Sequence, residues 1–215
     1  FDGDVWLGNR FRPGATEVVW TRFTSGLHEP LSLQIRDEEI FVFDRNGIWR
    51  LVDRDENREA DFHALFSSRI DQTADTREFA AALEVEQDGS FLVCKPGQTG
   101  TFSAVLRISR DGKNVQLLAR GFRQPMLGYD PQTGQIAASD QQGQWVPSTP
   151  VLFIEQDGYY GYPYDDADRQ RDIVPPLTWI PHQICGSSMS IVWDATRPSD
   201  HSTISRSWFP TIRQS

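Results

Sequence analysis

The sequence predicts an all-β fold, because it combines short apolar runs, frequent turn signals and an internal repeat. Apolar residues gather in runs of a few positions, at 40–43, 91–93 and 105–108. Dipeptides that favour tight turns separate such runs: Asn46-Gly47, Asp88-Gly89, Asp111-Gly112, Thr133-Gly134 and Asp157-Gly158. Many short strands joined by hairpins give this pattern. Short helical turns are expected only at 59–68 and 78–82.

The internal repeat has the length of a β-propeller blade. Gly26-Leu27-His28-Glu29-Pro30 returns, with changes, as Gly121-Phe122-Arg123-Gln124-Pro125. Units begin near Gly26, Phe79, Gly121 and Pro176, about 42 to 55 residues apart, and each of the first three precedes a turn and a β run. This spacing predicts about four blades of an incomplete β-propeller at 1–195. A β-sandwich is the alternative, since it needs no such repeat.

Composition limits the partners of the chain. The net charge is −9, from 30 acidic and 21 basic residues, which disfavours nucleic acid and anionic membranes. No apolar run approaches the roughly 18 residues of a membrane span. Cys94 and Cys185 can form one disulfide or remain two thiols, and both readings stay open. The polar segment 196–215, with Pro198 and Pro210, is expected to be an irregular tail.

Four segments carry a family resemblance through their order and spacing. They are Gly-Phe-Arg-Gln-Pro with Tyr-Asp-Pro-Gln-Thr-Gly at 121–134, Asp-Gln-Gln-Gly-Gln-Trp-Val-Pro at 140–147, Asp-Gly-Tyr-Tyr-Gly-Tyr-Pro at 157–163, and the stretch 176–189. Together they resemble the six-bladed quinoprotein dehydrogenases of glucose, aldoses and sorbosone, and more narrowly their bacterial relatives with a haem domain. The resemblance implies the cofactor pyrroloquinoline quinone (PQQ), calcium, a periplasmic or secreted location, and a cytochrome c-type domain outside this chain.

The resemblance also assigns cofactor-binding residues. Arg123 matches the arginine that contacts the carboxylates of PQQ, which suits a planar guanidinium. Gln124 stands where the family has asparagine, and His182 is expected to open an inner strand at the channel rim. The family's acidic calcium pair has no counterpart at 147–151, and its histidine base is replaced by a stretch whose nearest candidate is Glu78. The catalytic residues therefore stay unassigned.

Three further features each allow a functional and a structural interpretation. Oxygen-bearing side chains at Asp53, Asp55, Asn57 and Asp61 resemble a calcium-binding loop, although Glu56 and Arg58 replace the usual glycines and a solvated acidic loop is the alternative. Lys95 follows a strand end, where it can face the channel or solvent. The tyrosines at 159, 160, 162 and 164 can stack on a ring ligand or latch two blades together.

These observations favour oxidation of sugars or related alcohols, with PQQ accepting a hydride. A non-catalytic propeller that binds carbohydrate or protein on its channel face is the alternative, and a calcium-dependent lactonase-like propeller is a third hypothesis. The sequence contains no GxSxG, HExxH, phosphate-binding glycine loop or dinucleotide fingerprint, which disfavours serine-hydrolase, ATP and nicotinamide chemistry.

Overall fold

The computed structural model describes residues 3–9, 13–14, 16–70, 78–79, 81–97, 102–143, 146–188 and 190–193. The tail expected at 196–215 lies outside these residues. Within them the strands form four sheets, and the one helical element is the short 3-10 helix η1 (Asp168–Gln170). No helix in the described part of the chain is long and apolar enough to cross a membrane.

Each sheet follows the order of its strands along the chain, with one exception. The two-stranded sheet pairs β1 (Val5–Asn9) with β2 (Val19–Thr24). The first blade contains β3 (Ser32–Arg36), β4 (Glu39–Asp44), β5 (Gly47–Val52) and β6 (Phe62–Ser67). The second contains β7 (Leu83–Val85), β8 (Phe91–Lys95), β9 (Ala104–Ile108) and β10 (Val115–Arg120). The third contains β11 (Pro125–Tyr129), β12 (Ile136–Asp140), β13 (Ser148–Phe153) and β15 (Thr178–Pro181). The exception is β14 (Gly158–Tyr159), which pairs parallel to β10 at the outer edge of the second blade.

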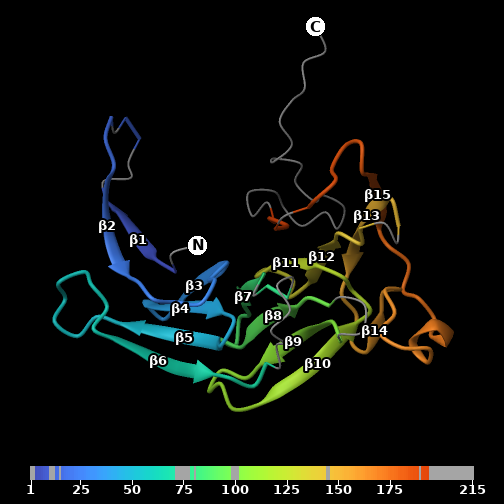
Figure 1. Cartoon of the computed structure of the whole chain (residues 1–215), viewed down its shortest axis with the longest axis horizontal. Helices are drawn as coiled ribbons and strands as arrows, with labels where there is room; N and C mark the ends of the chain where they lie inside the picture. Colours follow the sequence, from blue (N-terminus) through green and yellow to red (C-terminus); the bar gives the residue numbers. More distant parts are fainter. Residues whose placement is uncertain are drawn as a thin grey trace, which may run out of the picture.

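The sheets are arranged as the blades of a propeller. Figure 1 shows the three blades side by side in an arc, with β3, β7 and β11 towards the centre and the last strands at the periphery. The innermost strand β7 contacts both β3 and β11. The internal repeat therefore predicted the architecture correctly, because its copies become radially arranged sheets rather than the two layers of a sandwich.

Hydrophobic cores fill the spaces between neighbouring sheets. Strand β8 is buried along its whole length. Its Phe91 and Val93 belong to the core shared with the first blade, whereas Leu92 and Cys94 belong to the core shared with the third. Because side chains alternate between the faces of a strand, a sheet packed on both sides needs an unbroken apolar run. That is why the run at 91–93 lacks polar residues.

Two sequence expectations about local structure are wrong. The helical turn expected at 59–68 is largely strand β6, which pairs antiparallel with β5. The stretch at Pro176 does not open a new blade, because β15 pairs with β13 as the outermost strand of the third blade. The chain returns to the innermost strand later, where a Cβ on Gly128 of β11 would lie 2.2 Å from the carbonyl oxygen of Ile191. The turn expected at 78–82 falls partly outside the described residues.

Candidate functional site

The candidate site lies along one edge of the blades, which we call the rim. At this edge the innermost strand of each blade begins and its second strand ends, as β11 and β12 do in the third blade. In the first and third blades, a left-handed glycine opens the loop before the inner strand, with φ of 85° at Gly26 and 88° at Gly121. A side chain at Gly121 would also collide with the ring of Tyr159, since a Cβ would lie 2.5 Å from it. The repeated glycines therefore fix how the chain enters the rim.

A buried aspartate holds the rim loop of the third blade. Asp140, at the end of β12, is fully buried and accepts the backbone N–H groups of Arg123 at 3.0 Å and Gln124 at 2.7 Å. The side chain of Gln142 donates a third hydrogen bond at 3.0 Å. Burial raises the pKa of Asp140, and these three donors oppose that effect. Asp140 is therefore a structural latch for the segment that carries Arg123.

Arg123 presents its guanidinium group above the loop that follows β12. Its Nη1 donates to the carbonyl oxygen of Gln141 at 3.1 Å and to the side-chain oxygen of the same residue. A Cβ on Gly143 would lie 3.3 Å from the guanidinium carbon, so the glycine leaves room for the group. Among the described residues, Nε and Nη2 of Arg123 have no hydrogen-bonding partner. These donors are available to an anion.

The second blade adds a lysine to the rim. Lys95 ends β8 as Asp140 ends β12, and it is buried, with an exposed fraction of 8%. Glu78, which lies in the chain before β7, is fully buried. The sequence left open whether Lys95 faces solvent or the channel, and the structure removes it from the outer surface.

His182 lies at the outer edge of the third blade, whereas Arg123 precedes its innermost strand. It follows β15, the outermost strand of the third blade, and its backbone N–H donates to the carbonyl oxygen of Pro147 at 3.4 Å. The expectation that His182 opens an inner strand is therefore wrong. Its Nε2 is buried and lacks a hydrogen-bonding partner in the described part of the chain. Its role in cofactor binding stays a prediction.

Glu84 is a candidate that the sequence analysis missed. It lies on the innermost strand β7, and its carboxylate accepts a hydrogen bond from the side-chain amide of Gln34 on β3 at 3.2 Å. The same amide donates to the carbonyl oxygen of Leu83 at 2.8 Å, so Gln34 bridges two inner strands. Burial raises the pKa of Glu84 to about 7. The sequence feature that could have identified Glu84 is a single acidic residue between the apolar residues Leu83 and Val85 of a β run.

The buried thiol of Cys94 is affected by the charges of both Glu84 and Asp140. Burial raises the pKa of its thiol well above the usual value, and the negative charges of Asp140 and Glu84 add to this effect. Both carboxyl groups therefore act electrostatically on Cys94, the residue that precedes Lys95 on β8. Cys94 and Cys185 are free thiols, and a buried, protonated Cys94 is a poor nucleophile.

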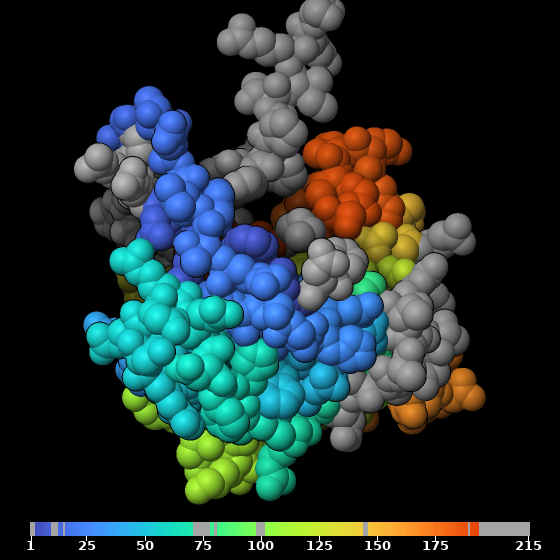
Figure 2. All heavy atoms as spheres, turned by 60° about the vertical axis from the view of Figure 1, so that its left-hand side comes forward, coloured from blue at the N-terminus to red at the C-terminus, as the bar shows by residue number. Residues whose placement is uncertain are grey.

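The acidic loop brings three of its four predicted ligands together at the opposite end of the first blade. Oxygen atoms of Asp53, Asp55 and Asp61 all lie within 4.8 Å of one another. Strand β5 starts at the rim and ends at this loop, which is the cyan segment on the surface in Figure 2. The loop is therefore remote from Arg123.

Hydrogen bonds inside the acidic loop shape it without glycine. Asp53 accepts from the backbone of Arg58 at 2.8 Å, and Asp61 accepts from the backbone of Arg54 at 2.7 Å. The side-chain oxygen of Asn57 accepts from the backbone of Glu59 at 2.7 Å. Glu56 and Arg58 adopt left-handed φ values of 59° and 74° where the resembling motif has glycine. Oδ1 of Asp53 is buried and has no hydrogen-bonding partner among the described residues.

One member of the tyrosine cluster, Tyr160, packs between two blades. Tyr160 is buried and stacks on Phe122, with ring centroids 4.8 Å apart. Its hydroxyl donates to the carbonyl oxygen of Phe153 at 2.7 Å. This ring therefore fills the core between the second and third blades, and the structural interpretation holds for Tyr160.

Comparison with known proteins identifies the fold. No family model matches the sequence, and no curated protein matches it. Among solved structures, the chain is similar to the PQQ-bound form of aldose sugar dehydrogenase from Streptomyces coelicolor, with a TM-score of 0.59 and 14% sequence identity. The match covers 89% of this chain and 68% of that enzyme. The chain thus shares the β-propeller fold of that protein.

Proposed function

We propose that this chain is a propeller domain that binds PQQ at the rim and oxidises sugars or related alcohols. The observation that carries the proposal is Arg123, whose guanidinium group stands at the rim with donors available on Nε and Nη2. It supports the proposal together with the likeness to a PQQ-bound sugar dehydrogenase, because the resembling segment 121–134 supplies an arginine for the quinone.

The residues of the rim fit an anionic quinone. PQQ carries carboxylate groups, and Arg123 and Lys95 place two cations at the rims of neighbouring blades. A guanidinium group pairs with a carboxylate through two hydrogen bonds, and an ammonium group acts as a point charge. Arg123, Lys95 and the side chain of Gln124 would hold the cofactor. When bound, it would supply a two-electron acceptor for the hydride of the alcohol carbon.

Glu84 is the proton acceptor in this proposal. Oxidation of an alcohol requires a base for the hydroxyl proton, and a base works best when its pKa is near the operating pH. The pKa of about 7 suits Glu84 for this task. Its hydrogen bond to Gln34 orients the carboxylate on the innermost strand. Glu84 thereby takes the role that the sequence analysis sought at Glu78.

The test uses the full chain reconstituted with PQQ and calcium. We expect quinone absorbance to remain with the protein after gel filtration, and aldoses to reduce an artificial dye. Arg123→Gln should weaken quinone binding at least tenfold, whereas Arg50→Gln should not, because Arg50 pairs with Glu39 on the exposed part of β5. Equal quinone binding by the two variants would contradict the assignment of Arg123.

A non-catalytic binding propeller is the alternative, and one observation favours it. The segment that corresponds to the family's calcium pair lies in β13, where Thr149, Pro150 and Val151 are buried and carry no carboxylate. A cation required for catalysis would lack these ligands. Glycan binding without dye reduction would support this alternative over the dehydrogenase.

We also propose that Asp53, Asp55, Asn57 and Asp61 bind a structural calcium ion. Calcium prefers several oxygen ligands from a flexible loop, and three carboxylates already converge there. Because the loop lies at the far end of the blade from the rim, this ion would stabilise the fold rather than contact PQQ. Such a site suits a periplasmic or secreted protein, and a cytochrome c-type domain outside this chain would accept the electrons.

A further inference from the structure

A polar pocket of about 130 Å³ lies at the outer edge of the second blade. It forms where β14, which follows the third strand of the third blade, pairs parallel to β10 of the second. Its lining residues are Leu117, Ala119, Arg120, Asp157, Gly158 and Arg171. β8 and β9 separate β10 from the innermost strand β7, so the pocket lies on the opposite side of the second blade from β7. Its Arg120 directly precedes Gly121, the glycine that opens the rim loop of the third blade.

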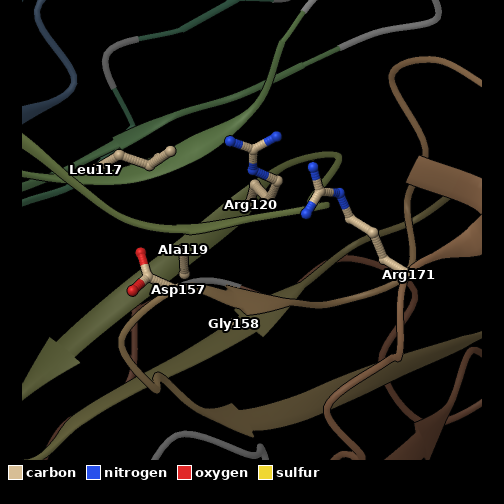
Figure 3. Close-up of a pocket in the computed structure, with 6 residues that line it drawn as sticks. All are labelled: Leu117, Ala119, Arg120, Asp157, Gly158 and Arg171. Carbon is tan, nitrogen blue, oxygen red and sulfur yellow. The ribbon is translucent and has the colours of Figure 1, made fainter. Parts of the chain in front are cut away.

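Two arginines form one wall of the pocket and share one buried carboxylate. Figure 3 shows the guanidinium groups of Arg120 and Arg171 turned towards each other. Arg171 Nε donates to Asp168 at 2.9 Å, and Nη1 of Arg120 lies 3.9 Å from the same oxygen. The side chain of Asp168 is only 4% exposed and also accepts from the backbone of Tyr164 at 3.1 Å. Two cations against one carboxylate leave a net positive charge at this wall.

Donors remain available on both arginines. Within the described part of the chain, Nη1 and Nη2 of Arg171 have no hydrogen-bonding partner, and neither do Nε and Nη2 of Arg120. The nearby Asp166 is engaged by Arg169 at 3.6 Å, and Asp165 accepts from the backbone of Asp168 at 2.9 Å. Planar guanidinium groups bind carboxylates through paired hydrogen bonds. This wall is therefore suited to a carboxylate.

The opposite wall carries an acceptor. Asp157 lies across the pocket from the arginines in Figure 3. Its Oδ1 accepts only from the neutral side chain of Gln156, at 3.0 Å, and Oδ2 has no partner among the described residues. The pocket therefore has a positive and a negative side. A dipolar ligand, with a carboxylate at one end and an ammonium group at the other, matches both.

Size restricts the ligand further. An engineered cavity of roughly 150 Å³ accommodates benzene, which has about six heavy atoms. A pocket of about 130 Å³ therefore suits a molecule of similar size. We propose that this pocket is a binding site for the zwitterion of a small α-amino acid, with the carboxylate on Arg120 and Arg171 and the ammonium group on Asp157.

The test compares three small probes by isothermal titration on the full chain without quinone. Alanine carries both charges, lactate replaces the ammonium group with a hydroxyl, and alaninamide lacks the carboxylate. We expect saturable alanine binding with a dissociation constant of about 1 mM, since few heavy atoms limit affinity. Lactate and alaninamide should each bind at least tenfold more weakly. Absence of saturation with alanine, or equal binding of lactate or alaninamide, would overturn the proposal.

Substitutions in the pocket test whether alanine binds there. Arg171→Gln and Asp157→Asn should each lower alanine affinity at least tenfold, whereas Arg169→Gln should leave it unchanged, because Arg169 does not line the pocket. Asp157 does not contact Asp168, so its variant leaves that ion pair intact. Asparagine also tolerates the left-handed φ of 62° at this position. Unchanged affinity in Asp157→Asn would exclude the pocket as the binding site.

Discussion

The first and third blades differ from the second at one equivalent position, the last residue of the second strand. Asp44 ends β4 and Asp140 ends β12, and both are buried. Asp44 accepts the backbone N–H of His28 at 2.9 Å, just as Asp140 accepts those of Arg123 and Gln124. In the second blade, Lys95 occupies this position. An ammonium group has no acceptor for backbone N–H groups, so it cannot form the same latch.

The difference separates structural from ligand-binding roles at the rim. In the first and third blades, the carboxylate at this position accepts backbone N–H groups of the loop that precedes the inner strand. In the second blade the charge has the opposite sign, and in the described residues it has no ion-pair partner. We infer that the aspartates stabilise the fold and that Lys95 serves an anionic ligand.

Removing a latch should have the largest effect. Asp140→Ala leaves two backbone N–H groups and the amide of Gln142 without their acceptor in a buried site. We expect the free energy of unfolding to fall by about 3 kcal/mol, as measured by denaturant titration. Asp44→Ala should cause a similar loss. A loss below about 1 kcal/mol in both variants would show that the aspartates are not latches.

Glu84→Gln should change how stability depends on pH. The pKa of Glu84 is raised from 4.5 to about 7 in the folded protein, so the folded state holds a proton that the unfolded state releases. Stability from this group is complete below pH 4.5 and is lost as the pH rises through about 7. Since the carboxyl is only partly buried, we expect the variant to exceed the parent by about 2 kcal/mol at pH 8, and to match it at pH 4.

Denaturant titration at the two pH values checks this expectation. Glu155→Gln is a suitable control, because Glu155 lies just beyond β13 and outside the innermost strands. A parallel pH dependence in Glu84→Gln and the parent would assign the titration to another group.

Local patterns predicted the elements that depend on neighbours in sequence. The runs at 40–43, 91–93 and 105–108 are β4, β8 and β9 in the structure, and Asn46-Gly47 lies at the turn between β4 and β5. The glycines at 26 and 121 mark equivalent loops because both need left-handed backbone. These features are fixed by short-range sterics and alternation, which one sequence displays directly.

Features that depend on distant packing were missed. Strand β6 follows a charged loop, and its own pattern does not reveal that β5 will pair with it. The proline and tryptophan at 176–179 resemble an opening segment, but β15 pairs with β13 as an outer strand, so His182 does not open an inner strand. The raised pKa of Glu84 arises from burial among three inner strands. Such pairings are decided by tertiary contacts that local propensity does not encode.

Lys95→Met should separate binding from stability. Replacing a buried ammonium group with an apolar side chain of similar length should change the free energy of unfolding by less than about 1 kcal/mol, in contrast to Asp140→Ala. Affinity for PQQ, measured by fluorescence quenching, should fall about tenfold, which corresponds to about 1.4 kcal/mol. A large loss of stability with unchanged PQQ affinity would give Lys95 a structural role like that of the aspartates.

The smallest effect is expected at the acidic loop, which lies at the other end of the first blade. If calcium binds there, it should raise the midpoint of thermal unfolding by a few degrees, because a ligand of the folded state stabilises it by mass action. Asp53→Asn should abolish the increase, since Asp53 contributes to the cluster a buried oxygen that has no hydrogen-bonding partner in the described part of the chain. Glu39→Gln is a matched control on the same blade, because its carboxylate pairs with Arg50 outside the cluster.

The quinone affinity of Asp53→Asn should equal that of the parent. A calcium response that persists in this variant would assign the ion to another part of the chain, and a loss of PQQ binding would show that the loop and the rim are coupled.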